Sequence, residues 1–271
     1  MIIILVFSLI SIGASFLTYW LAGFFNQSPW FLFLLLAFFV GYIAMFFAIY
    51  WFGLILLAQK YKGKETKKVN KFYLFHIKYL SAFTLVVNLI FVKQKGLKQI
   101  PKKPCLILFN HSSNYDFMTL YKNLKGKYAF IGKKELMYRP MTGVLSSAMG
   151  TLFVDRGNKE SGHQLVDDAV NYITNQNTSV VIAPEGTRSR NGELNPFKHG
   201  GFHIALRSKC PIVMVYIKGM DKARHKSKLK VAVVEDIVLK VIEPQDYENM
   251  TAGELASYCE NIYREYIKEN E

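Results

Sequence analysis

His111 and Asp116 are the residues of this chain whose types and spacing most directly suggest chemistry. They follow the apolar run Leu106–Phe109, and four residues separate them. A carboxylate so placed can accept the proton of one imidazole nitrogen, fix the tautomer and make the other nitrogen a better base. This is part of a catalytic triad with the nucleophile missing, so a substrate hydroxyl is expected to supply the attacking oxygen. In the alternative, Asn110, Ser112 and Asp116 only cap a helix, and His111 is an exposed loop residue.

A second cluster of polar side chains follows another apolar run, Val180–Ala183. The next residues, 184–190, include the carboxylate of Glu185, a glycine, a hydroxyl and two guanidiniums. Arginine is the side chain best shaped to grip phosphate, through two parallel hydrogen bonds. Arg156 ends a third apolar run in the same way. Arg188 and Arg156 at the mouth of one sheet would form a phosphate pocket.

Neighbouring strands of one sheet must position these clusters. Beyond Lys93 the chain alternates short apolar runs with helical periodicity, which indicates an α/β fold with a largely parallel central sheet flanked by helices. Ligands of such sheets bind beyond the carboxyl ends of the strands, where His111 and Glu185 are expected. The expected strands are 105–109, 128–131, 179–183, 212–217 and 230–234, and the expected helices are 116–124, 160–175, 200–208 and 252–268.

Charge is distributed very unevenly along the 271 residues. All 34 basic and 20 acidic side chains lie from Lys60 onward, and the formal net charge is +14. The pattern predicts a membrane segment at residues 1–59, followed by a basic globular part of ordinary domain size.

Residues 1–59 are expected to form an N-terminal two-helix membrane hairpin. Ile2–Phe25 and Trp30–Ala58 each provide the roughly 20 apolar residues that cross a bilayer, and polar residues 26–29 separate them. The lysine-rich flank at 60–71 predicts an integral membrane protein with its catalytic domain on the cytoplasmic side. A re-entrant hairpin would leave the domain on the same side. A cleaved signal peptide is disfavoured, because no basic region precedes the first apolar run.

Residues 60–92 are predicted as a basic linker that leads into an interfacial helix, with the α/β domain at 93–271. An amphipathic helix at the membrane surface is expected over Lys71–Thr84, followed by a strand over Leu85–Val92. An ordinary core helix of the globular domain is the alternative for the first of these.

The cysteines and the remaining histidines favour structural roles. Cys105, Cys210 and Cys259 form no CxxC pair, which argues against a disulfide framework or a zinc site and fits a reducing compartment. His199 and His203 have the spacing of a zinc-binding helix, but no glutamate follows His199 to act as its base. No metal site is therefore expected.

Four segments in this order resemble the glycerolipid acyltransferase family, whose best-known members are the 1-acylglycerol-3-phosphate acyltransferases. The resemblance spans about residues 96–219. Asn110–Asp116 matches the His-x4-Asp motif, Gly150–Arg156 the second block, Pro184–Ser189 the third and Cys210–Val215 the fourth. In the fourth, Met214 stands where a second proline is frequent.

The resemblance implies acyl transfer from a thioester to the sn-2 hydroxyl of 1-acylglycerol 3-phosphate, giving phosphatidic acid in phospholipid biosynthesis. His111 would act as the general base and Asp116 would orient its ring. The phosphate and glycerol of the acceptor would be bound by Glu185, Gly186, Thr187 and Arg188, with Arg156 as a weaker candidate. No cofactor is implied beyond the co-substrate, acyl-CoA or acyl carrier protein. The expected partners are the lysophospholipid, membrane lipids and, for a carrier-bound donor, acyl carrier protein.

Three rival functions remain at this stage. The same chemistry could act on another lysophospholipid. A membrane-bound serine esterase using Ser112 is less favoured, because the chain has no G-x-S-x-G elbow. A non-enzymatic lipid-binding or nucleic-acid-binding protein is suggested by net charge alone, and nucleic acid is not expected because no recognisable binding motif accompanies the basic residues.

Overall fold

The computed structural model describes residues 2–23, 32–189, 192–227 and 229–270. The chain divides into two compact units, Met1–Lys60 and Tyr61–Glu271. The smaller unit contains α1 (Ile2–Leu21) and α2 (Leu32–Ala58), and the larger one contains the sheet and the candidate site.

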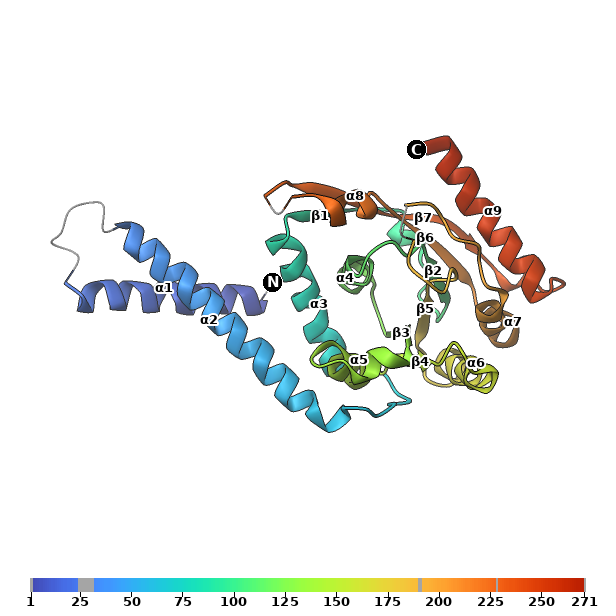
Figure 1. Cartoon of the computed structure of the whole chain (residues 1–271), viewed down its shortest axis with the longest axis horizontal. Helices are drawn as coiled ribbons and strands as arrows, with labels where there is room; N and C mark the ends of the chain where they lie inside the picture. Colours follow the sequence, from blue (N-terminus) through green and yellow to red (C-terminus); the bar gives the residue numbers. More distant parts are fainter. Residues whose placement is uncertain (1, 24–31, 190–191, 228, 271) are drawn as a thin grey trace. The chain divides into compact units, whose positions relative to one another are not determined.

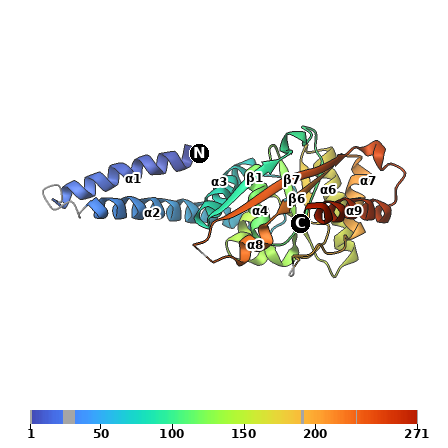
Figure 2. The same cartoon turned by 90° about the horizontal axis from the view of Figure 1, so that it is seen from above.

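The smaller unit is a pair of apolar helices packed side by side (Figure 2). The ring of Phe7 stacks on that of Phe46 at a centroid distance of 6.1 Å, and Thr18 Oγ1 lies 2.7 Å from Tyr42 Oη. The expected two-helix hairpin is therefore confirmed. Among the described residues, Phe33–Tyr61 is long and apolar enough to cross a membrane, with a mean hydropathy of 2.4, whereas the first helix offers a shorter apolar stretch, Leu5–Leu21. The polar break expected at 26–29 lies outside the described residues.

In the described part of the larger unit, seven strands form one sheet in the order β1-β7-β6-β2-β5-β3-β4. The strands are β1 (Ile90–Lys95), β2 (Leu106–Phe109), β3 (Tyr128–Lys133), β4 (Leu152–Val154), β5 (Ser179–Ile182), β6 (Ile212–Lys218) and β7 (Ala232–Ile242). Strands β2 to β6 run parallel to one another, while β7 is antiparallel to β6 and parallel to β1. The expected, largely parallel α/β sheet is confirmed.

Strand β2 is the centre of this sheet. Its residues Leu106–Phe109 are all buried, as expected for a parallel strand covered on both faces. It pairs with β6 on one side and with β5 on the other, where Leu106 is opposite Val180 and Leu108 is opposite Ile182. The carboxyl ends of β2 and β5 therefore lie next to each other, which brings the two sequence clusters to one edge.

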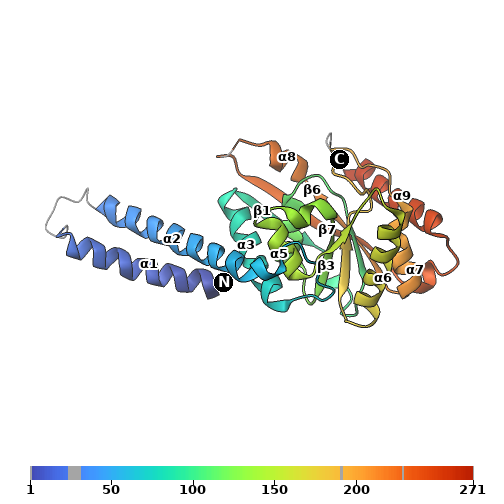
Figure 3. The same ribbon diagram turned by 60° about the horizontal axis from the view of Figure 1, so that its bottom comes forward.

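Helices cover both faces of the sheet (Figures 1 and 3). One face carries α3 (Lys71–Val87), α4 (Tyr115–Asn123) and α5 (Thr142–Met149), and the other carries α6 (Lys159–Thr174), α7 (His203–Ser208) and α9 (Ala252–Asn270). The Tyr263 hydroxyl of α9 donates to the carbonyls of Leu108 and Val215, both at 3.0 Å. Shorter elements are α8 (Met220–His225) and the 3-10 turns η3 (Gln59–Tyr61), η4 (Leu97–Gln99), η5 (Lys134–Tyr138), η6 (His199–Phe202) and η7 (Pro244–Asp246).

Helix α3 belongs to the larger unit, which differs from the separate linker expected at 60–92. Its inner face buries Tyr73, Leu74, Ile77, Leu80, Ser81 and Leu85. Its outer face exposes Phe72 and Phe75, so it is apolar on both sides. The strand expected from Leu85 starts later, because the helix continues to Val87 and the Asn88 side chain then caps it by donating to the Thr84 carbonyl.

Strand β7 is much longer than the expected 230–234. The strand continues through the charged pair Glu235–Asp236 to Ile242. Asp236 is fully buried, and its carboxylate accepts a hydrogen bond from the Asn123 amide of α4. A tertiary partner therefore makes a charged residue compatible with a covered strand.

Candidate active site

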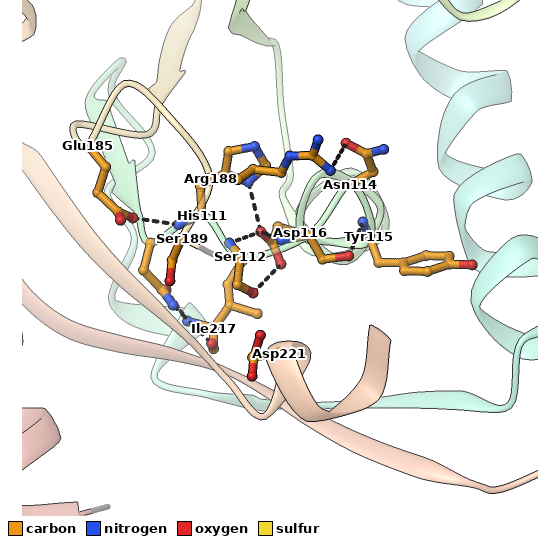
Figure 4. A network of polar contacts seen from close by, with 12 residues as sticks. His111, Ser112, Asn114, Tyr115, Asp116, Glu185, Arg188, Ser189, Ile217 and Asp221 are labelled. Atoms are coloured by element: carbon orange, nitrogen blue, oxygen red, sulfur yellow. Dashed lines mark hydrogen bonds and ion pairs between the residues drawn. The ribbon is translucent and has the colours of Figure 1, made fainter. Parts of the chain in front are cut away.

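His111 and Asp116 form a hydrogen-bonded pair at the carboxyl end of β2 (Figure 4). His111 Nδ1 lies 2.8 Å from Asp116 Oδ2, and the histidine side chain is 13% exposed. A proton on Nδ1 directed at the carboxylate leaves the lone pair of Nε2 available to accept a proton. The structure thus brings together the two residues expected as the base and its orienting acid.

The start of α4 holds the Asp116 carboxylate in place. Its Oδ2 accepts the backbone N–H groups of Ser112 and Ser113, both at 2.7 Å. The side chain is fully buried in the first turn of the helix, where the helix dipole favours a negative charge. Asp116 therefore orders the loop that precedes α4 and holds the His111 ring at once, whereas the N-cap position of α4 is Asn114, which makes no side-chain capping hydrogen bond.

Ser112 does not have the position of a catalytic serine. Its hydroxyl lies 3.5 Å from Asp116 Oδ1, on the acid rather than on the imidazole, and the residue is buried. A serine nucleophile needs its oxygen within hydrogen-bonding reach of the histidine base. This geometry disfavours the serine-esterase alternative.

Glu185 is enclosed beneath the site rather than open to a ligand. It is 2% exposed; its Oε1 accepts the His111 backbone N–H at 2.8 Å, and its Oε2 accepts the backbone and side-chain N–H groups of Asn195 at 2.9 and 3.0 Å. Burial raises the pKa of Glu185, and these hydrogen bonds oppose the rise. Both oxygens accept hydrogen bonds from the protein in this structure, and a contact of Glu185 with substrate stays a prediction.

The turn after Glu185 presents Thr187 and Arg188 to solvent. Gly186 has a φ of 71°, a left-handed conformation that glycine adopts without steric cost, and its N–H closes the turn onto the Ala183 carbonyl at 3.1 Å. Arg188 is exposed, and its Nη1 lies 3.4 Å from Asn114 Oδ1, just past His111 (Figure 4). The turn thus places a guanidinium beside the catalytic pair. Arg190 lies outside the described residues.

Arg156 lies farther along the same edge of the sheet. It follows β4, which β3 and β5 separate from β2, so three strand spacings of about 4.8 Å each lie between these strands. Partial burial lowers the pKa of Arg156, and the charge of Glu135 opposes this shift. Arg156 thus interacts electrostatically with Glu135, and its role in binding the phosphate stays a prediction.

Two asparagines complete the support of this site; the sequence reasoning considered Asn110 only as a helix cap and did not consider Asn195. Asn110 donates to the Ile217 carbonyl at 3.1 Å and accepts the Ile217 N–H at 2.7 Å, which extends the β2–β6 pairing by one side chain. Asn195 binds Glu185 from the other side. Asn110 directly precedes the histidine in its motif, so its position in the sequence could have indicated a role in the site. Nothing in the sequence around Asn195 indicates such a role.

The remaining candidate ligands are not arranged as a reactive centre. Within the described ranges, no group of three or more His, Cys, Asp or Glu side chains could hold a metal ion. All three cysteines are free and buried, and burial raises the pKa of Cys105 to about 11 and of Cys259 to about 12. At neutral pH these two are thiols, not thiolate nucleophiles.

The chain resembles known proteins both in sequence and in fold. Residues 90–218 match the family model described as Acyltransferase. The chain is 31% identical over 182 residues to the 1-acyl-sn-glycerol-3-phosphate acyltransferase of Escherichia coli (strain K12), a match that covers 64% of this chain and 74% of that enzyme. It is 27% identical over 228 residues to the alpha form from Homo sapiens, covering 84% and 77%. The crystal structure of the 1-acyl-sn-glycerophosphate acyltransferase of Thermotoga maritima shares the fold, with a TM-score of 0.60 at 23% identity over 72% of this chain and 78% of that one.

Proposed function

Because this chain belongs to the 1-acyl-sn-glycerol-3-phosphate acyltransferase family, we propose that it transfers an acyl chain from a thioester to the sn-2 hydroxyl of 1-acylglycerol 3-phosphate. The product is phosphatidic acid. The observation that carries the proposal is the His111–Asp116 pair at 2.8 Å, in a site whose neighbouring serine faces the acid and not the base.

The reaction needs no acyl-enzyme intermediate. His111 Nε2 takes the proton of the acceptor hydroxyl, and the oxygen attacks the thioester carbonyl carbon. The tetrahedral intermediate then breaks its C–S bond, and the imidazolium returns the proton to the departing thiolate. Asp116 stabilises the imidazolium between these two steps. Acyl-CoA and acyl carrier protein are both suitable donors, because the thioester chemistry is the same.

Arg188 is the residue best placed to bind the phosphate of the acceptor. Its guanidinium is exposed, lies beside Asn114 in the loop that follows His111, and has the planar geometry that suits phosphate. Gly186 and Thr187 supply the turn that presents it. Arg156, which follows β4 at the same edge of the sheet, stays the weaker candidate for the same phosphate.

The apolar segments suit an enzyme that works on lipids in a bilayer. The charge-free hairpin would anchor the chain, and the lysine-rich segment after it favours a catalytic domain on the cytoplasmic side. The exposed Phe72 and Phe75 of α3 would lie in the membrane interface, where basic residues also favour anionic headgroups. A tethered enzyme need not extract either the lysolipid or its product completely.

Acylation of lysophosphatidic acid by membranes that carry the wild-type chain or the His111→Ala variant tests this function. Labelled acyl-CoA and acyl carrier protein are supplied in parallel, and wild type is expected to form labelled phosphatidic acid. His111→Ala should lower the rate by about 10²–10⁴-fold, the usual contribution of a general base. Transfer by the variant at the wild-type rate would exclude the mechanism, and release of free fatty acid without acceptor acylation would indicate an esterase.

A further inference from the structure

Arg224 connects the two loops that carry the candidate site. It lies on α8, beyond the matched family segment 90–218, and its side chain is 18% exposed. Its Nη1 donates to the backbone carbonyls of Ser112 and Ser189, the latter at 3.3 Å. We call residues 110–114 the histidine loop and residues 183–189 the arginine loop. One guanidinium nitrogen therefore binds the main chain of both loops.

The two carbonyls belong to peptide segments that already hold the catalytic pair. The N–H of Ser112 donates to Asp116 Oδ2 at 2.7 Å, and the N–H of Ser189 donates to the His111 carbonyl at 2.8 Å. Arg224 thus binds the carbonyl groups of the same two residues whose N–H groups fix Asp116 and His111. Losing it would leave both carbonyls without this charged donor and would allow both loops to shift.

Helix α8 holds the guanidinium of Arg224 in a fixed orientation. Its Nη2 forms an ion pair with Asp221 Oδ1 at 2.9 Å, one turn earlier, and its Nε donates to His225 Nε2 at 2.9 Å. Figure 4 shows α8, which carries Asp221, beside the two loops. With three of its nitrogens engaged, the side chain behaves as a rigid connector rather than as a solvated surface charge.

We propose that Arg224 is a positioning residue that fixes the histidine loop relative to the arginine loop. It thereby sets the position of the His111 base relative to the phosphate held by Arg188. The inference rests on the function proposed above. It assigns a role to the basic segment 222–230, whose lysines alone would indicate only a solvated or membrane-facing loop.

Steady-state kinetics of the purified full-length enzyme in lipid vesicles test the proposal. Arg224→Ala should lower kcat by about 10–100-fold, since a misplacement of about 1 Å can cost 10²-fold in rate. The KM for the acyl donor should stay the same.

Added guanidinium at millimolar concentration, far below denaturing levels, should restore part of the kcat that Arg224→Ala has lost. Arg224→Lys should be intermediate, because an ammonium lacks the planar fork. Lys222→Ala is the matched control, since this exposed lysine is on the same helix.

Hydrogen exchange provides a readout that does not depend on activity. In Arg224→Ala, the amides of Ser112 and Ser189 should exchange faster than in wild type, while amides of the central strands should not. If wild type fails to acylate lysophosphatidic acid, the proposed function fails, and exchange alone decides the role of Arg224. Unchanged kcat would overturn the proposal, whether or not exchange is faster. A loss of kcat that guanidinium and lysine both fail to restore would overturn it too.

Discussion

The Glu185 carboxylate accepts the backbone N–H of His111 at 2.8 Å, so the acid of one sequence motif holds the main chain of the base of another. A second hydrogen bond holds the same residue, because the Ser189 N–H donates to the His111 carbonyl at 2.8 Å. Together with Asp116 on the ring, these groups fix the histidine at three points. The spacing of functional groups in this site is thus set by backbone contacts between loops at the ends of two adjacent strands.

Replacing Glu185 with glutamine should impair both stability and catalysis. Each oxygen of Glu185 accepts N–H groups, so the amide of glutamine must direct its own N–H at another donor. A buried donor left unsatisfied costs about 1–3 kcal/mol, and the shift of His111 should lower kcat by about 10-fold or more. Urea unfolding and kinetics of Glu185→Gln measure these effects. Glu248→Gln, at an exposed site, is the control; equal behaviour of the two variants would contradict the supporting role.

Asp116→Asn should separate the charge of this residue from its geometry. The asparagine oxygen can take the position of Oδ2 and accept the same N–H groups, with the amide nitrogen directed toward Ser112. Folding and both KM values should therefore stay near wild type. Without the negative charge the imidazolium is less stable, so kcat should fall by at least about 10-fold. An unchanged kcat would show that orientation alone is the contribution of Asp116.

Arg188→Ala should raise the KM for the lysolipid much more than the KM for the acyl donor. A hydrogen bond to a charged group is worth about 1.5–3 kcal/mol, which corresponds to a KM increase of roughly 10–150-fold. Arg207→Ala is a suitable control, because that exposed arginine pairs with Asp167 on the helical layer that carries α6 and α7. The reverse pattern, with only the donor KM raised, would move Arg188 to the donor site.

Asp236→Asn should stabilise the enzyme at neutral pH and lose this advantage in acid. Burial raises the pKa of Asp236 from 3.8 to about 6, so the native state binds a proton more tightly than the unfolded chain does. The wild-type free energy of unfolding must therefore fall as pH rises from about 4 to 6 and stay lowered above that window, by at most about 3 kcal/mol. Urea midpoints of both proteins at pH 5 and 7.5 measure the difference. A gap that is larger at pH 5 would contradict this sign.

Local sequence patterns predicted the centre of the fold and the catalytic pair. The apolar runs of β2 and β5 are short and bounded by turn residues, and each ends at a cluster of polar side chains, so their carboxyl ends could be placed at one edge. The direction of β7 could not be read in this way, because the apolar pattern of a strand does not tell which way it runs relative to its neighbours. The strand continues through the charged Asp236, whose partner Asn123 is more than a hundred residues away in the sequence.

The contacts of Glu185 and Arg224 are parts of the site that could not be predicted from the sequence. A glutamate next to an exposed arginine suggests a ligand contact, and only the folded chain reveals that its oxygens face inward to His111 and Asn195. Arg224 lies among lysines that reach solvent, and its binding to two distant carbonyls depends on the path of α8. Contacts to backbone atoms leave no pattern of side-chain types that a reader of sequence could detect.

The enclosure of all three thiols has a practical consequence for spectroscopy. No native cysteine is more than 3% exposed (Cys105, Cys210 and Cys259), so a thiol-reactive probe should not react with them in the native enzyme. One cysteine introduced at an exposed position, such as that of Phe75 in α3, would then carry a fluorophore or spin label without removal of any native cysteine. A single label of this kind would report whether its position in the enzyme moves from water into lipid when vesicles are added.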